Sequence, residues 1–129
     1  MKKLISKFTD QLRDALIIGE NSELNKTNKT FNNIVITGLG GSGIGGKIVA
    51  QLVQNNIDTP VFVNNGYHLP AFVNEKTLVI VSSFSGNTEE TLEAMKIAQD
   101  KNAEIACISS GAFSISIFGC CFPFPLRDS

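Results

Sequence analysis

The feature of this sequence that most limits its possible folds is a three-part unit that occurs twice. Each unit is a short apolar stretch (residues 34–37 and 78–81), a loop rich in glycine or serine (38–46 and 83–88), and then apolar residues at helical spacing. Strands that alternate with helices are typical of a parallel sheet with helices on its faces. The second stretch is apolar throughout, as a strand covered on both faces should be. The sequence therefore predicts an α/β domain.

The rest of the chain supplies the other elements of such a domain. With the further apolar stretches included, parallel strands are expected near 34–37, 61–63, 78–82 and 104–108. Helices are expected to follow the two loops, over about 44–53 and 88–101. An amphipathic helix near the N-terminus is predicted by the helical spacing of Leu4, Ile5, Phe8, Leu12, Ala15 and Leu16. We therefore divide the chain into an N-terminal helix and linker (1–33), a ligand-binding domain (34–111) and a tail (112–129).

The tail does not continue the alternation of strands and helices. It holds four of the nine phenylalanines and two of the three cysteines, and it lacks a helical period. Residues 114–118 alternate as a strand would. The sequence leaves open whether this tail folds or is disordered.

Composition excludes several classes of function. Hydrophobic residues make up 43% of the chain and charged residues 18%, as in a globular domain. The net charge is -1 without a basic cluster, so nucleic acid is not an expected partner. No apolar run is long enough for a membrane span, the N-terminus does not resemble a signal peptide, and the cysteines lack metal-site spacing. We expect a cytoplasmic protein with no metal, no cofactor and no membrane partner.

Both small-residue loops are placed where a phosphate binds well. Each lies between the end of a strand and the start of a helix, where backbone N–H groups lack partners and the helix dipole is positive. Glycines let the backbone approach the anion, and hydroxyl groups add donors. Neighbouring parallel strands would present both loops at the same carboxyl edge of the sheet. The residues expected to bind a phosphorylated ligand are Gly40, Gly41, Ser42, Gly43, Ser83, Ser85, Gly86, Asn87 and Thr88.

Each loop also has a purely structural interpretation. The first would be a glycine-rich turn, although five glycines between positions 38 and 45 exceed what a turn needs. The second would be a helix cap formed by Asn87 or Thr88, with Glu90 or Thr91 returning a contact. Capping by one residue does not explain three hydroxyl groups and a glycine in one loop.

Two nucleotide-binding alternatives are also open. The spacing of Gly38, Gly40 and Gly43 matches a dinucleotide fingerprint, but that site needs an acidic residue after the second strand, where this chain has Asn64 and Asn65. The second loop is similar to a flavodoxin phosphate loop. Flavodoxins place that loop after the first strand and flank the flavin with aromatic residues, whereas this chain has no Trp and one Tyr.

The pairing of the two loops resembles the sugar isomerase (SIS) domain. Residues 38–46, 65–70 and 83–91 are similar to three consecutive features of its bifunctional phosphoglucose/phosphomannose isomerases, and the resemblance covers about 1–111. It implies a doubly wound parallel sheet and aldose–ketose isomerisation through an enediol. It also implies a hexose 6-phosphate ligand bound by Ser42, Ser83, Ser85 and Thr88.

The resemblance also implies groups that this sequence lacks. In the family a glutamate base and a ring-opening histidine lie in a second lobe, the histidine coming from the other subunit of a homodimer, and an arginine follows the fourth strand. Here residues 109–112 lead directly into the tail, so the sequence looks like a first lobe that ends in a truncation or a shifted reading frame, and its catalytic residues are unknown. SIS domains also act as sugar-phosphate sensors, so a non-catalytic role stays open. We expect surface or structural roles, not catalysis, for His68, Glu89 and Glu90. For Lys47 we expect a solvated position, with contact to the phosphate as the alternative.

Overall fold

The chain folds as an α/β domain around one parallel sheet. The computed structural model describes residues 7, 9, 10, 12–14, 16, 17, 20, 30–38, 40–83, 89–109 and 121–123. The elements after the N-terminal segment are β1 (Asn33–Thr37), α2 (Gly41–Val53), β2 (Val61–Asn64), β3 (Thr77–Ser83), α3 (Glu89–Asp100), β4 (Glu104–Ser109) and β5 (Cys121–Pro123). The four predicted strands are confirmed to within one residue at each end. The described residues between Lys7 and Glu20 are helical, as predicted.

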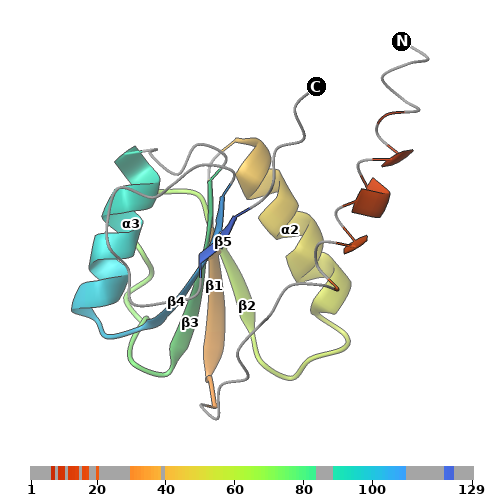
Figure 1. Cartoon of the computed structure of the whole chain (residues 1–129). Helices are drawn as coiled ribbons and strands as arrows, with labels where there is room; N and C mark the ends of the chain where they lie inside the picture. The colour runs from red at the N-terminus through yellow and green to blue at the C-terminus, as the bar shows by residue number, and fades with distance from the viewer. Residues whose placement is uncertain are drawn as a thin grey trace.

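The chain extends the sheet in one direction from β1 and in the opposite direction from β3. The order is β2-β1-β3-β4-β5, and every neighbouring pair is parallel. From β1 the chain crosses through α2 to β2 on one side, and from β3 it crosses through α3 to β4 on the other. The two helices cover opposite faces of the sheet (Figure 1). The doubly wound arrangement is confirmed, and its topological switch point lies between β1 and β3.

The main core lies between the sheet and α3. Met95 and the strand residue Val79 are fully buried there. Residues 65–76 connect β2 to β3 without a helix, and they contribute Leu69 and Val73 to the same core. An irregular segment therefore covers part of this face, beside α3.

On the other face, α2 lies close to the sheet because its inner residues are small. A β-carbon at Gly46 would lie 2.8 Å from Cγ2 of Ile36, so a larger residue at this position would push the helix away from β1. Gly43 and Gly46 are both buried. The close approach fixes the position of α2 relative to the end of β1.

Local signals also explain how α3 ends. Asn102 has a φ of 58°, a left-handed conformation that asparagine tolerates better than most residues. The Ala103 N–H donates to the carbonyl of Ala98 at 3.0 Å, and the Asn102 N–H donates to the carbonyl of Gln99 at 3.0 Å. This pair of bonds is a Schellman motif, which satisfies the last carbonyls of the helix.

The strand β5 was not predicted from the sequence. It pairs with β4 in parallel and forms the outer edge of the sheet (Figure 1). Pro123 lacks an N–H group and is tolerated there because an edge strand has one unpaired side. The alternating residues 114–118 lie outside the described residues.

Candidate functional site

The two loops begin on adjacent strands at the switch point. In the register of β1 and β3, Thr37 lies beside Val81, so β3 extends two residues further, to Ser83. The chain leaves β1 toward α2 on one face and leaves β3 toward α3 on the other (Figure 1). Loops that diverge in this way leave a crevice at the carboxyl edge, which is the usual ligand site of open α/β sheets. The prediction that both loops follow neighbouring parallel strands is confirmed.

The start of α2 has the backbone that an anion site needs. Gly40 precedes the helix with φ 58° and ψ -128°, a conformation that a side chain would strain. Among the side chains that the structure describes, none caps this end, and the first turn contains no acidic residue. The first N–H groups of a helix have no intrahelical acceptor, so this end of α2 is of the kind that can donate to an external anion.

The side chain of Asn65, which follows β2, lies very close to the start of α2. A β-carbon added at Gly43 would lie 2.8 Å from the carbonyl oxygen of Gly38 and 2.9 Å from Oδ1 of Asn65. Both distances are shorter than a carbon–oxygen contact allows, so this position requires glycine. Asn65 thus lies directly against the glycine-rich loop.

The described part of the second loop is its first residue. Ser83 is buried, and it lies on the same face of β3 as the core residues Val79 and Val81, toward α3. Ser85, Gly86, Asn87 and Thr88 lie outside the described residues, and so does the side chain of Ser42. Their contact with a ligand stays a prediction.

The segment after β2 connects to both sides of this site. Nδ2 of Asn64 donates to Oγ1 of Thr37 at 3.3 Å and to the carbonyl of Gly66 at 3.1 Å. The Tyr67 hydroxyl donates to Oε1 of Glu90, in the first turn of α3, at 3.0 Å. This hydrogen bond, followed by partial desolvation and by the charges of Glu90 and Glu89, raises the pKa of the Tyr67 phenol above its ordinary value of 10.0.

These contacts were not predicted as such from the sequence. The signal that points to them is the stretch 65–70, noted only as a likeness to a family. The structure gives that stretch a physical role: Asn65 meets the first loop, Tyr67 meets α3, and Leu69 enters the core.

The remaining polar candidates lie at the surface. His68, Lys47 and Glu89 are exposed, which agrees with the surface roles expected of them. Within the described part of the chain, no three His, Cys, Asp or Glu side chains come together as a metal site would require. Among the same residues, no helix has both the length and the apolar character needed to cross a membrane.

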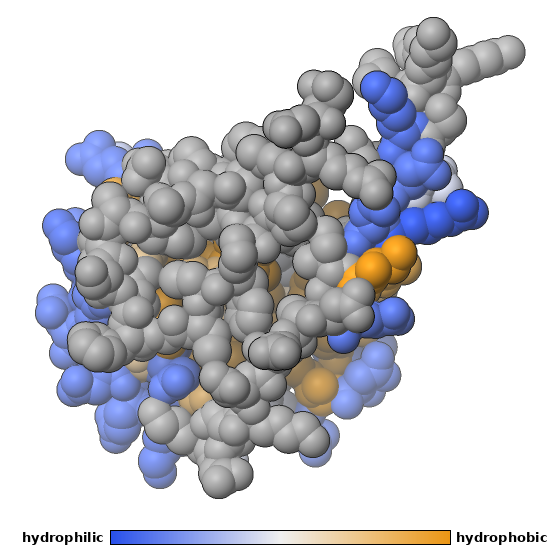
Figure 2. All heavy atoms as spheres, in the orientation of Figure 1, coloured by the Kyte–Doolittle hydropathy of each residue, from blue (hydrophilic) through white to orange (hydrophobic). Residues whose placement is uncertain are grey.

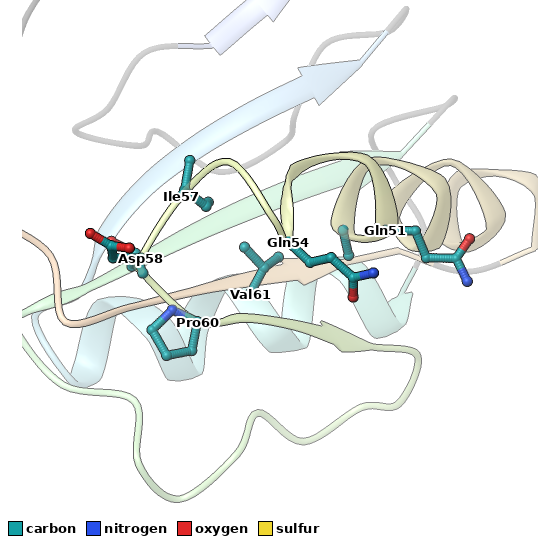
Figure 3. Close-up of a pocket in the computed structure, with 8 residues that line it drawn as sticks. Gln51, Gln54, Ile57, Asp58, Pro60 and Val61 are labelled. Atoms are coloured by element: carbon teal, nitrogen blue, oxygen red, sulfur yellow. The ribbon is translucent and has the colours of Figure 1, made fainter.

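A shallow cavity of about 230 Å³ lies away from these loops (Figure 3). Its lining residues come from the last turns of α2, from residues 57–59, and from Pro60 and Val61 at the start of β2. Since α2 runs back along the sheet from the glycine loop, this cavity is at the opposite, amino edge. Ligand sites in open α/β sheets lie at the carboxyl edge, so the two loops are the stronger candidate.

The strand order, with its switch point between β1 and β3, defines a domain of the doubly wound α/β class. The chain belongs to the SIS domain family, whose sequence profile matches residues 30–116. The resemblance noted in the sequence is therefore confirmed.

Individual relatives carry the comparison further. The bifunctional phosphoglucose/phosphomannose isomerase of Caldicellulosiruptor bescii is 45% identical over 111 residues, which cover 86% of this chain and 33% of that protein. The protein of the same description from Thermoplasma acidophilum is 50% identical over 82 residues, 64% of this chain and 26% of its own. The chain thus spans about a third or less of the length of these relatives.

One solved structure extends the likeness over nearly the whole chain. The tagatose-6-phosphate ketose/aldose isomerase of Escherichia coli superposes with a TM-score of 0.64 and 19% identity. The match covers 96% of this chain and 35% of that one. At this identity the likeness concerns the fold alone.

Proposed function

We propose that this chain binds a hexose 6-phosphate in the crevice between its two small-residue loops. The observation that carries the proposal is the placement of the loops on β1 and β3, adjacent parallel strands whose connections diverge to opposite faces. A single glycine-rich turn would need no partner loop. Two such loops at a switch point suit a small ligand with a phosphate at one end and hydroxyl groups at the other.

The roles of the residues follow from their donors. The first turn of α2 offers the backbone N–H groups of Gly41, Ser42 and Gly43. Gly40 adopts the positive φ with which the chain enters the helix. A phosphate bound there gains from the helix dipole and needs no lysine. The second loop adds hydroxyl and amide donors, which we assign to Ser83, Ser85, Gly86, Asn87 and Thr88. Hydrogen bonds of this kind to a charged group are the stronger class in proteins.

Relatives described as isomerases suggest the parent reaction, an aldose–ketose interconversion. Such a reaction needs a base within hydrogen-bond reach of the proton to be removed. The described carboxylates nearest this edge are Glu89 and Glu90, and Glu90 already accepts a hydrogen bond from Tyr67. Both lie in the first turn of a helix, the usual place for carboxylates that interact with the helix dipole, so their position has a structural explanation. We therefore propose binding without efficient turnover by the 129 residues alone.

Calorimetric titration with glucose 6-phosphate and fructose 6-phosphate tests the binding proposal. Saturable binding of the phosphorylated sugars, with none by glucose at the same concentrations, is the expected result. Failure of both phosphosugars to bind would contradict the proposal.

A coupled assay of glucose 6-phosphate conversion tests the catalytic part separately. We expect turnover far below the 1–1000 per second that is ordinary for enzymes. Turnover near about 1 per second, abolished in Glu89→Gln or His68→Ala, would show that this lobe carries its own acid–base groups.

A further inference from the structure

The helix α2 is apolar on two opposite faces. Its inner face is the stripe of small residues that meets the sheet, with Gly43 and Gly46 buried. Its outer face carries Ile44, Ile48 and Leu52, which are 61%, 53% and 69% exposed. These three follow one another at intervals of four residues. With roughly 100° between successive residues, they lie about opposite the inner stripe.

The helix α3 has no comparable exposed apolar face. The exposed positions of α3 are Glu89, Glu93, Lys96 and Asp100, as expected of a helix with one face in water. On α2, Val49 is also half-exposed and extends the apolar surface. Figure 2 shows hydrophobic atoms at the surface on the side of the molecule that carries α2 and the described N-terminal turns. A helix that is apolar on both faces is normally covered on both.

A second exposed apolar ridge occurs in the same chain. In the N-terminal helix, Leu12 and Leu16 are 52% and 69% exposed, and Ile17 beside them is half-exposed. Leu12 and Leu16 are four residues apart, the same spacing as the ridge on α2. Ridges of this kind interdigitate in the commonest class of helix pairs, with axes crossing at about 50°.

The connection between the two segments allows them to meet. The Ile34 N–H donates to the carbonyl of Pro60 at 2.9 Å, so the start of β1 lies beside the end of the α2–β2 connection. Residues 21–32, which join the N-terminal helix to β1, can reach roughly 40 Å. The 13 residues of α2 span only about 20 Å, so the tether reaches the whole outer face. Figure 1 places the described N-terminal turns on the α2 side of the sheet.

We infer that the outer face of α2 is the docking surface for the N-terminal helix of the same chain. Leu12 and Leu16 pack against Ile48 and its neighbours, and the charged residues of that helix face water. A tethered segment is present at an effective concentration of about millimolar, well above the concentration of a second copy in a dilute solution. The intramolecular partner therefore occupies the surface first. This inference does not depend on the proposed sugar-phosphate site.

Limited trypsin digestion of the full chain tests the inference, because a docked helix is protected from cleavage after Lys7 and Arg13. In Ile48→Asp we expect cleavage at these two bonds to accelerate roughly tenfold, since proteolysis follows the population of the open state. Leu16→Asp should have the same effect. The matched control is Phe72→Asp, a comparably exposed apolar position on the loop 65–76, which should leave both cleavage rates unchanged. Circular dichroism verifies that each variant retains the fold.

Sedimentation velocity over a range of concentrations tests whether a second copy of the chain, and not the N-terminal helix, covers the outer face of α2. We expect a monomer for the wild-type chain and for Ile48→Asp. A dimer that Ile48→Asp dissociates, with unchanged cleavage after Lys7 and Arg13, would assign the surface to a second copy and overturn the inference. Equal cleavage rates in the wild type, Ile48→Asp and Leu16→Asp would overturn it as well.

Discussion

The hydroxyl of Tyr67 donates a hydrogen bond to the carboxylate of Glu90, and the two oxygens lie 3.0 Å apart. The residues are 23 positions apart in the chain, one after β2 and the other in the first turn of α3. Asn65, two residues before the tyrosine, lies against Gly43 at the start of α2. One short segment therefore contacts the starts of both helices that flank the switch point.

The titration of Tyr67 should report this contact directly. It is the only tyrosine, and the chain has no tryptophan, so near-ultraviolet absorbance follows one phenol. The hydrogen bond to Glu90 raises its pKa above 10.0, so any stabilisation of the fold is present at lower pH and is lost as the pH rises through the folded pKa. In Glu90→Gln the midpoint should fall toward its value in the unfolded chain. In Glu89→Gln the change should be smaller, and equal midpoints in the wild type and Glu90→Gln would refute the assignment.

The contact between Gly43 and Asn65 predicts an asymmetric pair of alanine variants. Gly43→Ala forces a β-carbon against a backbone oxygen and should destabilise the fold by about 1–3 kcal/mol. Gly45→Ala meets nothing within 4 Å in the same helix, and it should stabilise the fold by up to about 1 kcal/mol because alanine favours helices. Urea unfolding of both variants checks the pair. Equal effects would mean that the loop is looser than described.

The phosphate proposal predicts a local loss of affinity. Thr88→Ala should weaken glucose 6-phosphate binding by about 1.5–3 kcal/mol, the usual loss for a hydrogen bond to a charged group. Thr59→Ala is the matched control because Thr59 lines the cavity at the opposite edge of the sheet. Calorimetry of the two variants decides between the sites. A loss of affinity in Thr59→Ala alone would show that the ligand binds in that cavity.

The buried position of Met95 predicts a large effect from truncation. Its side chain is fully buried between α3 and the sheet, so Met95→Ala leaves a cavity and should lower the free energy of unfolding by about 2–5 kcal/mol. Lys96→Ala, at an exposed position of the same helix, should change it by less than about 0.5 kcal/mol. Urea denaturation measures both. A loss below about 1 kcal/mol for Met95→Ala would show that the core relaxes around the site.

The sequence predicted the strands well because their signal is local. Residues 78–81 are apolar throughout, and this pattern needs a covered central strand whatever lies elsewhere in the chain. The loops were found for the same reason, since glycine and serine clusters lie between each strand and its helix. The strand β5 carries no such signal, because three residues that include Pro123 are too few to show a period.

Contacts between distant segments were harder to predict. The bond from Tyr67 to Glu90 depends on how the connection 65–76 crosses the sheet, which no local pattern specifies. The helix α2 shows a second limit. Its period is read from the apolar residues Ile44, Ile48, Val49, Leu52 and Val53. All of these except Val53 are exposed, and the sheet contacts a stripe of small residues instead. Periodicity identified the helix without identifying which face is buried.

The connection 65–76 is the part of this domain that we expect to open most easily. It covers part of the main core without the internal hydrogen-bond ladder of a helix, and Leu69 and Val73 are its buried apolar anchors. Segments with few buried contacts detach at a lower free energy than the whole fold does. Transient release of this cover would bare the central strands while α3 and the sheet remain intact. The same release would withdraw Asn65 and Tyr67 from the starts of both helices, so local opening of the core and loosening of the loop crevice are expected to be one event.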